Sequence, residues 1–135
     1  MGHSLSIELR YLIYCGFLML ILWVPNIAAE LRMTGIPKAL DYPDKRSLPN
    51  WGARLKDAHY NLVENIVPFA IAVGAGELLN VHTAVTAACA TLFFWARVLH
   101  PLAQVTRIWG TRTLTFAAGV TATLVYLYAV LTSAT

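Results

Sequence analysis

Polar side chains recur at helical spacing inside a stretch that is otherwise apolar. Residues three or four apart share one face of a helix, and five polar residues follow that spacing: Arg54, Asp57, Asn61, Glu64 and Asn65. At 1.5 Å of rise per residue, Glu64 lies roughly 13 to 15 Å beyond the level of Arg54. A lone carboxylate at that depth in a bilayer costs on the order of 2.5–3.5 kcal/mol, so Glu64 needs a partner, a water-filled cavity or a proton.

A second polar face comprises Arg97, His100 and Gln104, which are also spaced three and four residues apart. We expect Arg97 to pair with Glu64, because the pair would relieve the desolvation penalty of both charges. A plainer interpretation is that these residues only hold helices together, since interhelical hydrogen bonds are common in membrane bundles.

Several basic and donor-bearing residues fall at corresponding ends of their helices and predict one cationic cleft. Arginine forks suit carboxylates. A small anionic, amphipathic molecule would fit there, with its polar part in the cleft and its apolar part reaching lipid. The residues expected to form the cleft are Arg54, Asn61, Arg97, His100, Arg107, Arg112 and Thr113.

The composition indicates that lipid is the solvent for much of the chain. Of its 135 residues, 58% are hydrophobic and only 13% are charged, far from ordinary globular composition. A bilayer-spanning helix needs roughly 20 mostly apolar residues. The sequence therefore predicts an all-α, integral membrane four-helix bundle, a single domain over 1–135, with spans at 7–32, 53–79, 82–106 and 111–133 and a loop at 33–52.

The charges predict an orientation in the membrane. Every lysine and arginine except Arg10 lies between the apolar windows 11–29 and 58–76 or between the windows 78–96 and 113–135. By the positive-inside rule, both loops would face the cytoplasm and both termini the opposite side. This distribution argues against a nucleic-acid partner. Cys15 and Cys89 lack metal-ligand spacing, so we expect no metal site.

Three motifs carry a resemblance to a known family. They are RLKDAHYNLVEN from Arg54 to Asn65, FFWARVLH ending at His100, and RTLTF from Arg112 to Phe116. Together they resemble the MAPEG family, the membrane-associated proteins in eicosanoid and glutathione metabolism, over roughly residues 23–131. The short tails and the Glu-Asn-x-x-Pro-Phe run are similar to the small bacterial inner-membrane branch, which implies that location.

The resemblance implies a homotrimer that binds glutathione between subunits. Arg112 and Thr113 match the arginine and hydroxyl that stabilise the thiolate, so they are the expected catalytic residues. A nearby cation lowers the pKa of a thiol from about 8.5 and makes it a better nucleophile at neutral pH. The expected activity is glutathione S-transferase-like or peroxidase chemistry on a lipophilic electrophile. The residues expected to bind glutathione are Arg54, Asn61, Glu64, Arg97, His100, Gln104 and Arg107.

Four positions depart from the family pattern. Asp57 and Tyr60 stand where arginines are usual, and Gln104 and Phe116 stand where tyrosines are usual; Phe116 has no hydroxyl to donate. An alternative is therefore a non-catalytic, lipid-binding member or an accessory subunit of a membrane complex. A further alternative is a small proton-coupled exporter, in which Glu64 would bind a proton and a cationic drug in turn.

Overall fold

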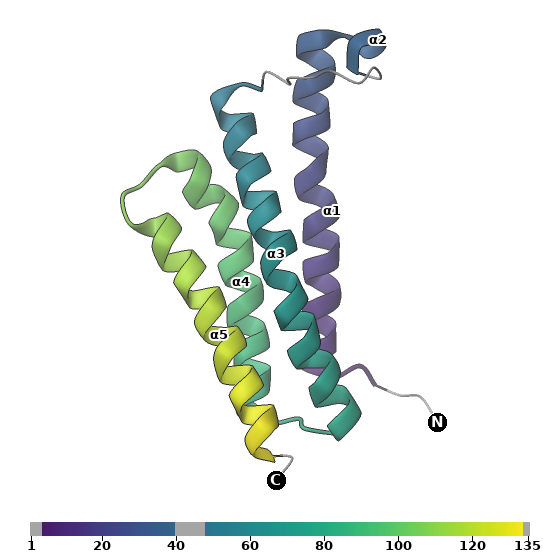
Figure 1. Ribbon diagram of the computed structural model, residues 1–135, viewed down its shortest axis with the longest axis vertical. Coiled ribbons are helices and arrows are strands. Elements are labelled where there is room, and N and C mark those ends of the chain that lie inside the picture. Colours follow the sequence, from purple (N-terminus) through teal and green to yellow (C-terminus); the bar gives the residue numbers. More distant parts are fainter. Residues whose placement is uncertain (1–3, 40–47, 134–135) are drawn as a thin grey trace.

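Four long helices run side by side in the computed structural model, which describes residues 4–39 and 48–133 (Figure 1). They are α1 (Ile7–Thr34), α3 (Asn50–Leu79), α4 (Ala84–Thr106) and α5 (Thr111–Ser133), and a short helix, α2 (Ile36–Ala39), follows α1. Each of the four is long and apolar enough to cross a membrane. The described part of the chain contains no strand, so the predicted all-α membrane bundle is confirmed.

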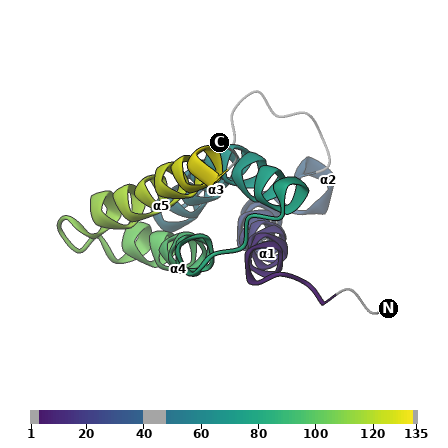
Figure 2. The ribbon, with the colours of Figure 1, turned by 90° about the horizontal axis from the view of Figure 1, so that it is seen from below.

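Helices α3 and α4 form the middle of the bundle. Each packs against the other, against α1 and against α5, whereas α1 and α5 do not contact each other in the described chain. Seen along the helices, α4 and α5 form a hairpin on one side of α3 and α1 lies on the other (Figure 2). Surfaces of α3 and α4 that meet three neighbours are therefore where polar groups can be enclosed.

The two ends of the bundle differ in charge. The first turn of α1 and the last turn of α5 lie at one end, and α2 and the α4–α5 turn lie at the other (Figure 1). We call the latter the basic end, because the described residues Arg32, Lys38 and Arg107 lie there. Lys45 and Arg46, which the sequence assigns to the same loop, lie outside the described residues.

The core is built from stacked rings and small residues. Phe69 of α3 and Phe93 of α4 stack with their centroids 3.9 Å apart, and Tyr126 of α5 meets Phe69 edge-on at 6.2 Å. A Cβ on Gly76 would lie 3.0 Å from the Tyr126 hydroxyl oxygen. Small residues of this kind let membrane helices approach closely, because little apolar attraction drives helices together in lipid.

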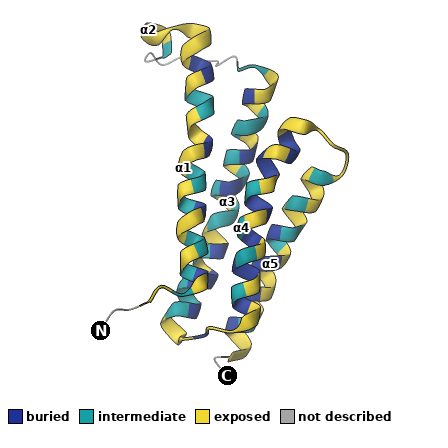
Figure 3. Ribbon diagram, turned by 180° about the vertical axis from the view of Figure 1, so that it is seen from behind, coloured by how far each residue is buried: buried dark blue, intermediate teal, exposed yellow. Residues whose placement is uncertain are grey.

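The outer surface is apolar along most of its length. Large side chains such as Phe17 and Leu20 of α1 and Leu124 and Tyr128 of α5 are exposed, and exposed residues follow the outward side of each helix (Figure 3). Such a surface suits lipid or a further protein subunit.

The boundaries of the first loop differ from the predicted 33–52. Helix α1 continues to Thr34 and α3 already begins at Asn50. Gly35, with φ 76°, caps the end of α1. The short helix α2 then forms where a loop was expected. Pro37 fits α2 because a proline in the first helical turn removes no helical hydrogen bond. Residues 40–47 of this predicted loop lie outside the described chain.

Candidate functional site

Two adjoining cavities at the basic end are lined by most of the expected site residues. The arginine cleft has a volume of about 310 Å³, and the inner pocket has a volume of about 270 Å³. Arg112 lines both, so the cavities meet at its side chain. The arginine cleft is lined by Arg54, Asp57, Ala103, Gln104, Arg107, Ile108 and Arg112. The inner pocket is lined by Asn61, His100, Arg112, Thr113 and Phe116.

The arginine cleft gathers three guanidinium groups from three elements. Arg54 lies on α3, Arg107 caps the end of α4, and Arg112 lies in the first turn of α5. Asp57 is the one carboxylate among the lining residues. In the part of the chain that the structure describes, no ion pair joins it to these arginines. The guanidinium groups therefore remain available to an anion, which arginine can hold with two parallel hydrogen bonds.

The turn between α4 and α5 brings two of these arginines together. Arg107 adopts a left-handed conformation with φ 58°, and its backbone N–H donates to the Ala103 carbonyl at 3.2 Å. Gly110 follows with φ 79°. The chain thus reverses within a few residues, so Arg107 and Arg112 line the same cleft. A left-handed residue other than glycine costs about 1–2 kcal/mol, and the structure accepts this cost at Arg107.

Arg97 is enclosed rather than open to either cavity. It is only 1% exposed, and its guanidinium donates to Asn61 Oδ1 at 2.5 Å and to the Phe116 carbonyl at 3.4 Å. The rings of Phe93 and Phe116 lie within 5.1 and 5.9 Å of Cζ. Because the Asn61 oxygen accepts from Arg97, the Asn61 amide N–H groups are left for other acceptors, and Asn61 lines the inner pocket. Arg97 therefore positions Asn61.

The expected ion pair between Arg97 and Glu64 does not form. Glu64 is exposed on the surface of the subunit, and the Arg97 hydrogen bonds go to Asn61 and Phe116 instead. The prediction was wrong because residues three apart share a face only broadly. A step of three residues turns the helix by about 300°, so Glu64 points about 60° away from Asn61.

Glu64 lies on an exposed stripe of α3 and lines neither cavity. Tyr60, Val67 and Ile71 are more than half exposed, and with Glu64 they are spaced four, three and four residues apart, which places them on one face. The Glu64 carboxylate is therefore exposed among apolar side chains on a helix that is long and apolar enough to span a membrane. Within one subunit, the structure brings the other expected site residues together and leaves Glu64 apart.

His100 and Gln104 are held by bonds within the subunit. The Thr115 hydroxyl donates a hydrogen bond to the Thr111 carbonyl oxygen at 2.9 Å. The same hydroxyl is 2.9 Å from His100 Nδ1, so the His100 Nδ1–H donates to it. His100 Nε2 is then the acceptor for the Gln104 amide at 3.4 Å. Both ring nitrogens are thus used internally, which favours a structural role for His100.

The start of α5 presents a hydroxyl and a cation side by side. Arg112 and Thr113 are exposed, and both line the inner pocket. The first turn of a helix carries backbone N–H groups without helical partners. The first helical bond of α5 is made by Leu114, whose N–H donates to Gly110 at 2.9 Å. Positive partial charge, a guanidinium and a hydroxyl therefore converge, which favours an anion such as a thiolate.

A polar network at the opposite end was not foreseen from the sequence. Glu8 is buried and accepts a hydrogen bond from Thr86 at 2.6 Å, and Ser6 donates to Glu77. His82 lies 3.6 Å from Glu8 and 3.8 Å from Glu77. The available signal was the position of both acids at helix ends beside the turn that carries no lysine or arginine. These contacts fasten α1, α3 and α4 together.

Comparison with known proteins supplies a family. The family model described as "MAPEG family" matches residues 9–132, nearly the whole chain. A search of curated proteins finds no match. The match covers all four long helices except Ile7, Glu8 and Ser133 at their ends, and it includes every residue of the arginine cleft and the inner pocket. The protein is therefore a multi-pass integral membrane protein, and it belongs to the MAPEG family.

Proposed function

We propose that this protein binds glutathione in the arginine cleft and the inner pocket and directs its thiol at lipophilic electrophiles. The observation that carries the proposal is the convergence of Arg54, Arg107 and Arg112 on one cleft that contains a single carboxylate. Glutathione carries two carboxylates and one ammonium group, so this donor set fits it. Three guanidinium groups serve the carboxylates, and Asp57 serves the ammonium group.

Arg112 and Thr113 are proposed to activate the thiol. With the peptide carboxylates in the arginine cleft, the thiol lies toward the inner pocket, because Arg112 lines both cavities. The guanidinium and the start of α5 stabilise the thiolate over the thiol, and the Thr113 hydroxyl donates to the sulfur. In a transfer reaction the thiolate displaces a leaving group from carbon. In a peroxidase reaction two thiols become a disulfide while a hydroperoxide becomes an alcohol and water.

A route for the electrophile lies between α4 and α5. An apolar groove of about 360 Å³ is lined by residues that include Leu99, Leu102 and Leu114. It shares Ala103 and Ile108 with the arginine cleft. A lipophilic substrate can therefore reach the cleft from the bilayer without crossing water. This arrangement favours lipid-soluble substrates over polar ones.

We further propose that the working unit is a homotrimer in which Glu64 reaches the site of a neighbouring subunit. Support comes from the exposed stripe of Tyr60, Glu64, Val67 and Ile71. Facing lipid, the Glu64 carboxylate would cost about 2.5–3.5 kcal/mol. Covered by another subunit, it would gain a partner, and the apolar members of the stripe would pack.

Calorimetric titration of the detergent-solubilised protein with glutathione tests the binding. We expect Arg112→Ala to weaken binding about tenfold or more, in line with the loss of a charge-assisted hydrogen bond. Arg97→Ala should also weaken binding, because Asn61 loses its orientation. An analogue with a methyl group in place of the thiol should still bind. An absence of binding at millimolar glutathione would refute the proposal.

The chemistry is tested separately from the binding. Thr113→Val keeps the side-chain shape and removes the hydroxyl, so we expect turnover of a model electrophile to fall while glutathione affinity changes little. Phe116 is the specific observation that favours a second function, because it lines the inner pocket without a hydroxyl. Binding without turnover of any electrophile would support that function, a non-catalytic member that uses the cleft to hold a ligand.

A further inference from the structure

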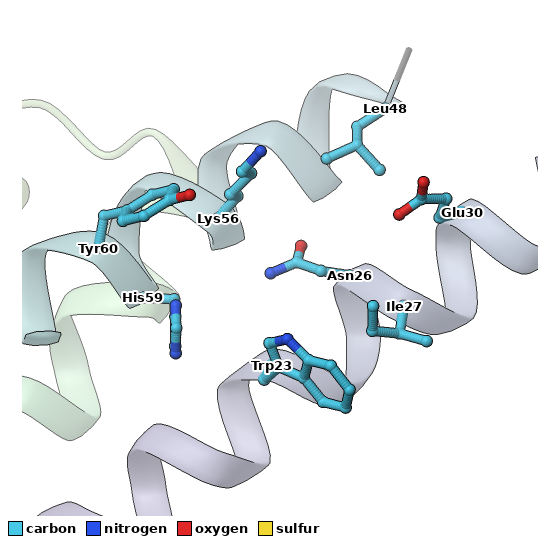
Figure 4. A pocket seen from close by; sticks show the side chains of 8 residues that line it. All are labelled: Trp23, Asn26, Ile27, Glu30, Leu48, Lys56, His59 and Tyr60. Atoms are coloured by element: carbon cyan, nitrogen blue, oxygen red, sulfur yellow. The ribbon is translucent and has the colours of Figure 1, made fainter. Parts of the chain in front are cut away.

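A further polar cavity lies on the other side of α3, between α1 and α3. This cavity, the α1–α3 pocket, has a volume of about 220 Å³. It shares no lining residue with the arginine cleft or the inner pocket. Figure 4 shows side chains from both helices directed into the space between them. The pocket is lined by Trp23, Asn26, Ile27, Glu30, Leu48, Lys56, His59 and Tyr60.

Asn26 presents a hydrogen-bond acceptor without a donor. Its side-chain N–H donates to the Leu22 carbonyl at 3.5 Å. Its Oδ1 atom is buried and takes no hydrogen bond from the described residues. Leaving a buried acceptor unsatisfied is unfavourable, so the pocket selects an occupant that carries an N–H or O–H group.

Lys56 presents a cation without an anion. Its Nζ lies 5.7 Å from the centre of the Tyr60 ring, and within the described chain no carboxylate forms an ion pair with it. Glu30 adds a buried carboxylate to the same pocket. An occupant that combines an anionic group for Lys56 with an N–H donor for Asn26 Oδ1 therefore suits both polar groups of the pocket.

The position of the pocket in the membrane points to a lipid. Trp23, at its rim, is 54% exposed, and such a ring favours the boundary between lipid and water. Leu20 and Val24, which are four residues apart and share a face of α1, are exposed next to Trp23. An occupant whose head group enters the pocket can therefore lay its acyl chains along these residues.

We propose that the α1–α3 pocket binds a phospholipid whose head group carries a primary ammonium beside its phosphate, as in an ethanolamine phospholipid. Lys56 donates to the phosphate, and the ammonium donates to Asn26 Oδ1 while it faces the Trp23 ring. A choline head group has the same charges but no N–H, so it cannot satisfy Asn26. The site is therefore expected to distinguish two lipids that differ only in three methyl groups.

Thermal unfolding in detergent with added lipid tests this site, with ethanolamine and choline phospholipids of identical acyl chains. The ethanolamine lipid should raise Tm more and should bind about three- to tenfold more tightly, the effect of one hydrogen bond. Lys56→Met should weaken binding of both lipids. Lys38→Gln, which removes an exposed charge of α2, should change neither and serves as the control.

Asn26→Leu separates a lost contact from a damaged fold. Leucine has a similar shape and leaves no acceptor to satisfy, so with choline lipid alone the variant should melt no lower than the parent. It should also lose the preference for ethanolamine lipid. Equal responses of the parent protein to both lipids, or a preference that survives Asn26→Leu, would overturn the proposal. An equal Tm rise with soluble glycerophosphoethanolamine would overturn the assignment to a lipid.

Discussion

The Arg97 guanidinium and Gly119 fit together as a pair across α4 and α5. A Cβ added to Gly119 would lie 2.7 Å from Arg97 Cζ and 2.8 Å from Nε. The position therefore requires glycine for space, although its backbone is ordinary helix. Arg97 in turn donates a hydrogen bond to Asn61. The absence of a methyl group at position 119 of α5 therefore leaves room for the guanidinium that positions Asn61 of α3 at the wall of the inner pocket.

Gly119→Ala should therefore displace Arg97 and disturb the site. We expect a loss of about 1–3 kcal/mol in the free energy of unfolding, the usual cost of overpacking, together with weaker glutathione binding. Gly74→Ala is the matched control, since nothing lies within 4 Å of a Cβ there, and it should gain up to about 0.5–1 kcal/mol. Thermal unfolding and titration measure both effects. Equal behaviour of the two variants would contradict the role assigned to Gly119.

Arg107 allows charge and backbone effects to be separated. Its left-handed φ of 58° suits glycine better than arginine. Arg107→Gly should therefore keep or raise Tm while it removes one cation from the arginine cleft. We expect several-fold weaker glutathione binding and a smaller dependence of binding on salt. Unchanged affinity would show that Arg107 does not contact the ligand, and a lowered Tm would show that its side chain supports the turn.

At the scale of elements, the lengths of the apolar runs were enough to predict the four helices, and the positions of the basic residues were enough to predict the end at which the cleft lies. Neither pattern gives the rotation of each helix about its axis or the angles at which the helices cross. Asn61 and Glu64 belong to one polar stripe, yet only Asn61 meets Arg97. The role of Asn26 could not be predicted for a related reason. The residues of α3 that line the pocket with it are distant in the sequence, and they meet it only through the packing of α1 against α3.

The network opposite the basic end shows how an element can be fixed by one hydroxyl. Thr86 donates to the buried Glu8 at 2.6 Å and accepts from the Thr83 N–H at 2.8 Å. Thr86→Val should therefore destabilise the fold by about 1–3 kcal/mol, because a buried acceptor loses its donor. Thr91→Val is the control, since among the described residues the Thr91 hydroxyl bonds only the Ala87 carbonyl of its own helix.

Both threonine variants should bind glutathione as the parent does, because the arginine cleft lies at the other end of the bundle. Thermal unfolding and titration on the same preparations separate the two effects. A Tm for Thr86→Val equal to that of Thr91→Val would show that water replaces the hydroxyl at Glu8.

On the scale of the whole molecule, the cavities, the polar contacts between helices and the apolar surface lie in different regions. The basic end holds the arginine cleft, the inner pocket and the α1–α3 pocket, while the other end fastens α1, α3 and α4 through polar contacts. Between them, Glu64 is the one exposed charged side chain among the residues that the structure describes. That single carboxylate is therefore the feature of one subunit that most requires a second subunit.

Glu64→Gln keeps the side-chain shape and removes its charge, so it tests the assembly directly. If a neighbouring subunit covers Glu64, the trimer should persist by native mass measurement, because the apolar stripe still packs. Glutathione affinity should fall about tenfold or more, because a charge-assisted hydrogen bond to the ligand is lost. If Glu64 instead faces lipid, the substitution removes an unfavourable charge and raises Tm without changing affinity. A monomer in gentle detergent that binds glutathione equally with either residue would exclude the shared site.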